Sequence, residues 1–408
     1  MPTIPPAHRE PRPPRYRDLF RSPEFTPLFL SGAAQIAAQT VSGLGLATLV
    51  YRATGSPLLS ALAMFGPALA QLVGATTLLS AADRLPPRAA LTGVSLAFAA
   101  GTAAQTVPGL PTGAVFAILF LQGLVGSLGG GVRYGLLRQV LPPDAFLLGR
   151  SVFNMSTGVC QIAGFATGGL LLALLAPRGT LATGAVLHLL AALVAGRGLS
   201  RRAPRVTGRV SVAETWRTNA RLWASGPRRR VYLALWVPNG LIVGCESLFV
   251  PYDPERAGLL FACAALGMLA GDVAVGRFLP AGLRGRAAAP LQALLAAPYL
   301  LFALDPELPY AVAAIAVSAV GYGASLLYQE RLMALVPEEL SGHALGLHTS
   351  GMLALQGVSA ALAGGLAQLT SPAAAMSLLA VASLAVTLAL VLAGRPVAAA
   401  GERKRAEA

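Results

Sequence analysis

Residues 141–169 read LPPDAFLLGRSVFNMSTGVCQIAGFATGG, and residues 336–364 read VPEELSGHALGLHTSGMLALQGVSAALAG. The second stretch repeats the first at an offset of 195 residues, close to half of the 408-residue chain. Both keep a proline, an acidic residue, a glutamine and a glycine in register. The matched pairs are Pro142 and Pro337, Asp144 and Glu339, Gln161 and Gln356, and Gly169 and Gly364. The repeat predicts a chain built from two related halves.

Long apolar segments surround both copies of the repeat. A helix needs about 20 apolar residues to cross the hydrocarbon core of a membrane, and most of the segments are near that length. The chain is 55% hydrophobic and 12% charged, with a mean hydropathy of +0.64, whereas a typical soluble domain is about 25% charged. The segments cover residues 25–50, 58–80, 89–107, 112–136, 152–175, 179–197, 231–251, 257–276, 288–304, 309–328, 344–369 and 373–394.

These segments favour an all-α polytopic membrane protein. Open sheets are excluded from lipid because every backbone polar group must be satisfied within the chain, and the alternating pattern of barrel strands is absent from the sequence. An even number of crossings in each half gives both halves the same orientation. We therefore predict 12 transmembrane helices in two parallel six-helix bundles.

The arginines keep to alternate gaps between the segments. If the N-terminus is cytoplasmic, all but three of the 31 Lys and Arg residues lie on the cytoplasmic side or in inner helix ends; the exceptions are Arg52, Arg178 and Arg256. Positive charge retained on one side sets membrane topology, so we predict a cell-membrane protein with both termini cytoplasmic. Anionic lipid headgroups then account for the net charge of +14, and we expect no nucleic-acid partner.

The predicted organisation has five parts. The first is rich in Pro and Arg and contains no apolar run with a cleavage site, so we expect no removable signal peptide. In the linker, SVAETW at 211–216 is consistent with an amphipathic helix on the membrane or with a solvated basic linker. The parts are a disordered cytoplasmic tail (1–24), an N-terminal six-helix bundle (25–197), a cytoplasmic linker (198–230), a C-terminal six-helix bundle (231–394) and a cytoplasmic tail (395–408).

Six plus six helices, a long central loop and duplicated halves resemble the major facilitator superfamily of secondary transporters, over residues 22–394. The opening LFRSPEFTPLFL (19–30) and the run TGSP (54–57) are most similar to its drug-efflux members. The resemblance implies the MFS fold, with a small-molecule substrate bound between the halves and carried by alternating access.

The superfamily has a signature, Gly-x-x-x-Asp-Arg-x-Gly-Arg-Lys/Arg, between its second and third helices. Residues 79–88, LSAADRLPPR, keep the Asp-Arg pair and the last basic residue, but both glycines and one arginine are replaced. The resemblance implies a gate that locks the halves in one state; an ordinary loop ion pair, which contributes little stability, is the alternative. The gate candidates are Asp83, Arg84 and Arg88, with Arg133 or Arg138 as partner.

Two other motifs are partial. The stretch from Asp272 to Arg277 is a fainter counterpart of the gate signature in the second half. The exporter-associated motif Gly-Pro-x-x-Gly-Gly appears as Gly164-Phe165-Ala-Thr-Gly168-Gly169, with phenylalanine in place of proline. The resemblance implies export, although close helix packing through small residues also explains these glycines.

Polar residues deep in the segments predict the substrate site. They are costly in lipid and usually face a cavity. The third, sixth, ninth and twelfth segments carry almost none, and in the resembling fold those helices are peripheral. Hydrogen bonding between helices is the alternative for any single residue. The predicted substrate-binding residues are Gln35, Gln39, Gln122, Asn154, Gln161, Asn239, Tyr322 and Gln356.

This lining is nearly uncharged and favours a neutral or weakly cationic substrate, since only Arg133 is placed to meet an anion. Glu246 is the proton-coupling candidate, because burial favours the neutral form of a carboxyl group and lets it exchange protons as access alternates. The alternative is that Glu246 pairs with Arg256 near the outer surface.

No phosphate-binding loop and no nucleophile–base set occur in the sequence, so we predict no enzyme activity, no cofactor and no metal. We predict a monomeric secondary transporter that exports small amphipathic organic molecules, with protons as the coupling ion and membrane lipids around it. A nutrient-uptake symporter of the same fold, and a membrane scaffold or sensor that transports nothing, are the alternatives.

Overall fold

The computed structural model describes residues 16–77, 85–142, 145–203, 212–337 and 340–394, and helices make up nearly all of these ranges. No strand occurs within them. The helices are α1 (Tyr16–Leu19), α2 (Phe25–Thr54), α3 (Pro57–Thr77), α5 (Pro87–Ala104), α6 (Thr112–Val140), α7 (Phe146–Gly198), α8 (Val212–Ala224), α9 (Gly226–Ser247), α10 (Phe249–Tyr252), α11 (Ala257–Val273), η2 (Ala274–Phe278), α12 (Ala281–Ala296), η3 (Ala297–Leu304), α13 (Leu308–Val320), η4 (Gly321–Gly323), α14 (Ala324–Leu335), α15 (Ser341–Leu369) and α16 (Pro372–Gly394).

The predicted helical membrane fold is confirmed. Among the described residues, 10 helical stretches are long and apolar enough to cross a membrane. One of them, Leu148–Gly198 in α7, breaks at Ala176 (φ 56°, ψ 174°) and so holds two crossings. Pro177 follows, and a residue before proline is driven out of the helical region. With α5, which packs against α6 and α7, the described helices are consistent with the predicted 12 crossings.

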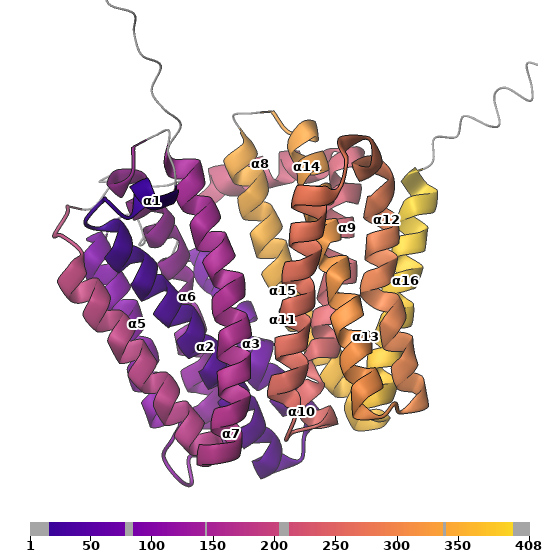
Figure 1. The fold of residues 1–408 in the computed structure, drawn as a ribbon, viewed down its shortest axis with the longest axis horizontal. Coiled ribbons are helices and arrows are strands. Elements are labelled where there is room, and N and C mark those ends of the chain that lie inside the picture. The colour runs from indigo at the N-terminus through magenta and orange to yellow at the C-terminus, as the bar shows by residue number, and fades with distance from the viewer. Residues whose placement is uncertain (1–15, 78–84, 143–144, 204–211, 338–339, 395–408) are drawn as a thin grey trace, which may run out of the picture.

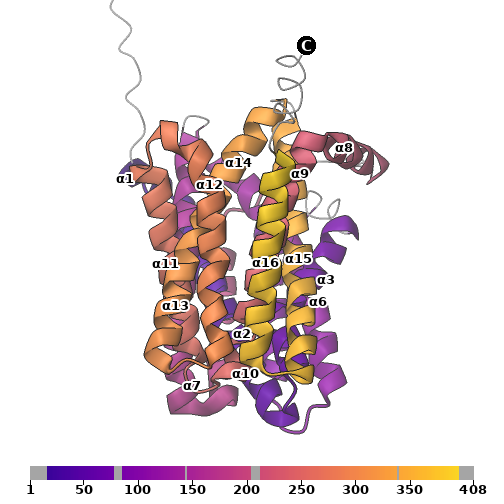
Figure 2. The ribbon, with the colours of Figure 1, turned by 90° about the vertical axis from the view of Figure 1, so that its right-hand side faces the viewer.

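The two ends of the bundle differ. Both described ends of the chain and α8 lie at one end, which we call the linker end; the opposite one is the far end (Figure 1). Figure 2 shows that α8 lies across the linker end and not along the bundle. Trp216 and Arg217 of α8 are exposed, whereas Leu222, further along the same helix, is fully buried. This difference between its faces is expected for an amphipathic surface helix.

The predicted disordered tail over 1–24 is wrong for its last residues. Tyr16–Leu19 form α1, and Leu19 is 1% exposed, within an apolar cluster that includes Phe25. Arg202 also donates to Glu24 at 2.7 Å, which ties this segment to the end of α7. Apolar burial and this ion pair order the segment. Residues 1–15 and the predicted tail 395–408 lie outside the described residues.

The predicted linker over 198–230 is too long at its end. Helix α9 begins at Gly226, so the three consecutive arginines at 228 to 230 lie within its first turns and not in the linker. Long basic side chains at a helix end reach the interface while their stems cover apolar surface. A run of charged residues at these positions therefore does not show where the helix begins.

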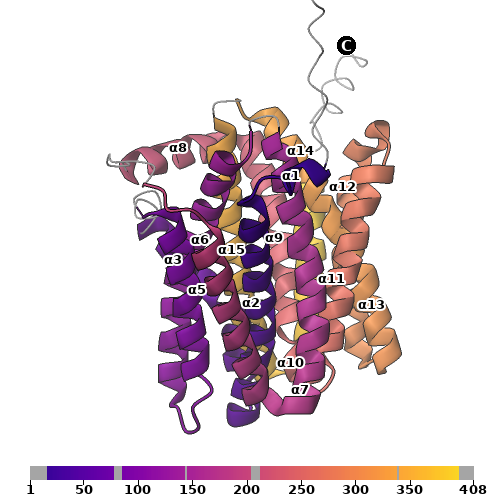
Figure 3. The same ribbon diagram turned by 60° about the vertical axis from the view of Figure 1, so that its left-hand side comes forward.

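Helix α2 lies between the two arms of α7 (Figure 3). It runs parallel to the first arm, where a Cβ on Gly164 would come within 2.9 Å of Thr40. It runs antiparallel to the second arm, where a Cβ on Gly45 would come within 3.2 Å of Thr180. Small residues allow such close helix contacts where lipid removes the hydrophobic drive for association.

The two halves meet through α3 against α15 and through α7 against α11. A Cβ on Gly169 of α7 would stand 3.1 Å from the Cα of Gly258 in α11. Tyr51 donates its hydroxyl to the carbonyl of Pro251 at 3.3 Å. All of these residues lie toward the far end of their helices, so close contacts between the halves are made there.

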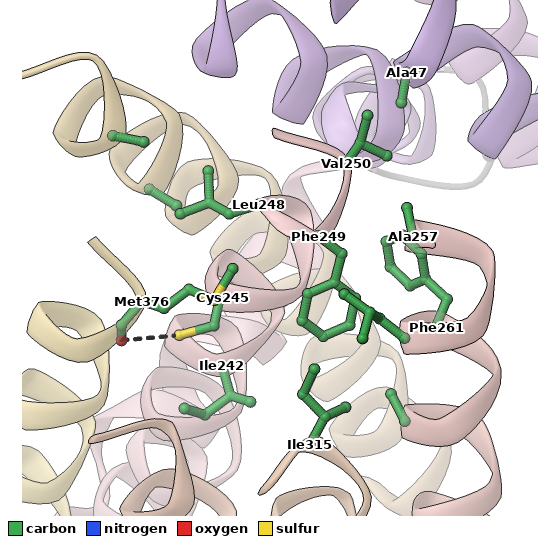
Figure 4. Packing of buried hydrophobic residues seen from close by; sticks show 14 of the residues in the cluster. Ala47, Ile242, Cys245, Leu248, Phe249, Val250, Ala257, Phe261, Ile315 and Met376 are labelled. Carbon is green, nitrogen blue, oxygen red and sulfur yellow. Dashed lines mark hydrogen bonds between the residues drawn. The ribbon is translucent and has the colours of Figure 1, made fainter. Parts of the chain in front are cut away.

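The clusters of buried apolar residues also differ between the two ends of the bundle. One cluster joins the halves near the far end, where Ala47 of α2 lies with Val250 and Ala257 (Figure 4). Toward the linker end the packing divides into two clusters, one around Leu136 in the first half and one around Leu332 in the second. The halves are therefore sealed at the far end and packed separately at the linker end.

Substitutions at two adjacent glycines test this far-end contact between the halves, which we call the seal. A Cβ on Gly364 would come within 2.5 Å of the Cα of Leu58 in α3, whereas a Cβ on Gly365 meets nothing within 4 Å. Overpacking costs about 1–3 kcal/mol, and about 1.4 kcal/mol is a factor of ten in population. We expect Gly364→Ala to lengthen the distance between spin labels at Thr54 and Thr370, measured by pulsed electron resonance. Gly365→Ala is the control, and equal distances in both variants would contradict the seal.

Candidate functional site

A cavity of ≈ 380 Å³ lies between the two halves. The first half contributes only Phe65, Gln161 and Phe165 to its lining, and the second half contributes the rest. Asp272, close to the linker end, is exposed, while Asn239, deeper in the bundle, is 6% exposed. The polar lining residues are Gln161, Asn239, Glu246, Asp272, Tyr322, Ser325, Gln329, His348 and Gln356.

Several residues predicted from the sequence line this cavity together. Gln161 reaches it from the first arm of α7, and Gln356 reaches it from α15. These two glutamines are the matched pair of the internal repeat, so the repeat places one amide in the cavity from each half. Asn239 and Glu246 enter from one face of α9 at i and i+7 spacing.

Glu246 and Tyr322 form the polar contact nearest the closed end of the cavity. The Tyr322 hydroxyl donates to Glu246 Oε1 at 2.9 Å, which joins α9 to η4. The alternative pairing of Glu246 with Arg256 is wrong, because Arg256 pairs with Asp253 at 3.2 Å three residues away. Glu246 is thus a half-buried carboxyl group that faces the cavity and accepts from one neutral hydroxyl donor.

Two predicted substrate-binding residues lie outside the described lining and form hydrogen bonds within the first half. Gln35 Oε1 accepts a hydrogen bond from His188 Nδ1 at 3.1 Å, within the contact between α2 and the second arm of α7. Gln122 donates to the carbonyl of Phe98 at 3.1 Å and to the Thr102 hydroxyl at 3.2 Å, between α6 and α5. Neither lines the described cavity. Both amides are buried against a neighbouring helix of the same half and form hydrogen bonds there, although Gln35 Nε2 has no partner among the described atoms.

Two other predicted residues are not placed in the cavity lining. Gln39 is exposed and absent from the described lining. Asn154 lies in α7, but its side chain is outside the described part of the structure. Their predicted contact with substrate stays a prediction.

Sequence reasoning missed Asp272 and His348 as lining residues. Asp272 lies in the partial motif from Asp272 to Arg277, and His348 belongs to no motif. Helical spacing carries the missing signal: Asp272 shares a face of α11 with Met268 and Phe261, and His348 shares a face of α15 with Met352.

The predicted gate is tested only in part. Asp83 and Arg84 lie outside the described residues, and Arg88 is half-buried at the start of α5. Arg133 packs against Gly32, on which a Cβ would lie 3.3 Å from the Arg133 Nε. The Arg138 Cζ lies 5.0 Å from the ring centroid of Phe146. The ion pair with Asp83 stays a prediction.

Solved structures share this fold. A POT family transporter in complex with a thioalcohol-conjugated peptide aligns with a TM-score of 0.71 and 11% identity, over 90% of this chain and 95% of that one. A mutant of the nucleoside transporter NupG aligns with a TM-score of 0.73 and 11% identity, over 91% and 100%. A bacterial homologue of the human lysosomal transporter Spinster, inward-facing and unoccupied, aligns with a TM-score of 0.65 and 15% identity, over 92% and 95%.

At these identities the likeness shows the fold alone. No protein-family profile matches the chain. No curated protein matches it either. The arrangement of helices is therefore shared with solved transporters, and the chemistry of the cavity has to be read from this chain's own residues.

The different positions of Gln161 and Gln122 generate a paired prediction. Gln161→Leu removes an amide from the cavity, so we expect it to abolish substrate transport while leaving the midpoint of thermal unfolding in detergent within about 1 °C. Gln122→Leu removes the hydrogen bonds to the Phe98 carbonyl and the Thr102 hydroxyl, and a hydrogen bond contributes about 0.5–1.5 kcal/mol of stability. We expect Gln122→Leu to lower that midpoint. The reverse assignment of the two effects would refute these roles.

Proposed function

We propose that this protein is a secondary active transporter that works by alternating access. The observation that carries this proposal is the cavity between two halves that seal against each other at one end only. Each half keeps its own apolar cluster toward the linker end. The halves are thus able to pivot as rigid bodies about the cavity, which is how parallel repeats give alternating access. The likeness in fold to solved transporters supports this proposal.

We place the linker end in the cytoplasm of a cell membrane, following the arginine distribution. The cavity would then load from the cytoplasm. This orientation, with the partial Gly164–Gly169 motif, favours export of small amphipathic organic molecules, as in the drug-efflux members that the sequence resembles. Uptake by symport uses the same cavity and differs in the direction of coupling.

We propose Glu246 as the proton-coupling residue. It is a half-buried carboxyl group that lines the cavity, and the Tyr322 hydroxyl contacts one of its oxygens at 2.9 Å. Its depth near the seal means that opening the far end would expose it to the outer solution. Proton binding there and substrate binding from the linker end would compete for one cavity, which is the basis of antiport.

The coupling is testable with purified protein in liposomes. The substrate probe is ethidium, whose permanent charge prevents trapping by pH alone, and the membrane potential is clamped at zero with potassium and valinomycin. Antiport predicts that an acidic lumen drives ethidium into the vesicles above the level in protein-free liposomes. Symport predicts accumulation with an acidic exterior. A scaffold or sensor predicts no difference from protein-free liposomes, and that result would contradict transport of this probe.

Glu246→Gln separates coupling from translocation. The variant keeps a hydrogen-bonding group of similar size but carries no exchangeable proton. We expect it to lose accumulation driven by the pH gradient and to keep ethidium counterflow, the exchange of labelled for unlabelled probe, within about threefold of wild type. Asp305→Asn, at an exposed far-end position, is the control. A variant that still responds to the gradient would exclude Glu246 as the coupling residue.

A further inference from the structure

The cavity has two carboxylates but no lysine or arginine among its described lining residues. Both acids, Glu246 and Asp272, come from the second half, while the first half contributes only neutral groups. Arg133, the arginine considered for an anionic substrate, packs beside Gly32 and outside this lining. A cleft lined by one sign of charge raises the local concentration of the opposite ion. The cavity therefore selects cations over anions.

The two carboxylates lie at different depths. Asp272 follows Gly271, on which η4 packs, since a Cβ on Gly323 would come within 2.8 Å of the Gly271 carbonyl oxygen. Glu246 is reached from η4 by the side chain of Tyr322, whose hydroxyl contacts Glu246 Oε1 at 2.9 Å. The two acids are therefore separated by about the length of a tyrosine side chain. They form two stations in one cavity, with Asp272 nearer the linker end.

The two stations differ in their hydrogen bonding. Glu246 already accepts from Tyr322. No hydrogen bond or ion pair engages the Asp272 carboxylate within the described ranges. Asn239 also lines the cavity; it is 6% exposed, and its Oδ1 is buried without a partner among the described atoms. The unpaired Asp272 carboxylate calls for a ligand that brings hydrogen-bond donors.

The groups beside Asp272 are apolar. Met268 lies one turn deeper on α11, and Met352 lies at a similar depth, roughly 15 Å from the linker end of α15. Deeper still, Phe165 and Phe261 stack across the two halves with centroids 4.6 Å apart. Thioether sulfur and aromatic rings both favour contact with an aromatic ligand body.

We propose that Asp272 recognises the charge of the substrate, and that the substrates are monovalent organic amines with an aromatic or apolar body. The ammonium group donates to Asp272 near the linker end, and the apolar body packs on Met268 and Met352. Glu246 is left free to exchange protons. This inference rests on the proposed function and adds to it the substrate class and the residue that sets it.

The experiment measures equilibrium binding to the purified protein in nanodiscs at pH 8, where an ordinary histidine such as His348 is neutral. The probes are two matched series: tryptamine, tryptophol and indole-3-acetate, and 2-phenylethylamine, 2-phenylethanol and phenylacetate. Members of a series share one ring system and differ in charge. We expect each amine to bind at least about tenfold more tightly than its alcohol, and the carboxylates to bind more weakly than the alcohols. Opposite charges in a partly exposed cavity give a preference of this order.

Asp272→Asn should weaken amine binding about tenfold and leave alcohol binding within about twofold. Asp272→Glu, which retains the charge, should keep the preference for amines. Asp305→Asn removes the same charge from an exposed far-end position and should change neither. Wild-type protein with no preference for the amines, or equal weakening of amine and alcohol by Asp272→Asn, would overturn the inference.

Failure of this inference is distinguishable from failure of the proposed function, because binding does not require translocation. Protein that binds amines through Asp272 but never moves ethidium would retain the recognition site and lose the transport proposal. Protein that exchanges ethidium for protons but shows no selective effect of Asp272→Asn would lose only the recognition site.

Discussion

The close contact between α7 and α11 at the far end is the constraint on which the rest of the structure depends. A Cβ on Gly258 would stand 2.4 Å from the Cα of Gly169, so any side chain at position 258 would force the two helices apart. In lipid, helices associate through packing at short distance and not through exclusion of water. Because the joint forms only at one end, the linker ends of the halves remain separate, and the cavity between them follows.

Polar residues lie in different surroundings in the two halves. In the first half, Gln35 and Gln122 hydrogen-bond to neighbouring helices, where they stabilise the bundle. In the second half, Asn239, Glu246 and Asp272 line the cavity. The first half thus serves mainly as a neutral wall against which the acidic second half closes. Any change of access moves the acids relative to that wall and to the solution, which is the physical requirement for coupling.

Much of the fold was predictable from the sequence because lipid imposes a length on every apolar segment. The break between 175 and 179 was visible as a gap around Pro177, and the structure bends there. The helix starts were less predictable where charge continues into the helix, as at Arg228. Order in Tyr16–Leu19 depends on the tertiary burial of Leu19, which no local pattern reveals.

The site was predictable only where a helical stripe pointed to the space between the halves. Asn239 and Glu246 form such a stripe. Gln122 is equally polar and equally deep, but it faces Thr102 of an adjacent helix, and the identity of that neighbour is set by tertiary packing. Asp272 was not predicted as a lining residue, because it lies in a partial match to a loop signature. The structure places it on the face of α11 that lines the cavity.

The central claim is that the far-end seal opens in every transport cycle. Gln368 Nε2 donates to Ser56 Oγ at 2.5 Å across this seal, so a Ser56→Cys, Gln368→Cys pair should be joined by a short thiol-reactive cross-linker. The most direct measurement is ethidium transport in liposomes before cross-linking, after it, and after cleavage of a reducible linker. Alternating access predicts that transport stops when the halves are joined and returns when the linker is cleaved. Full transport by the cross-linked protein would contradict it.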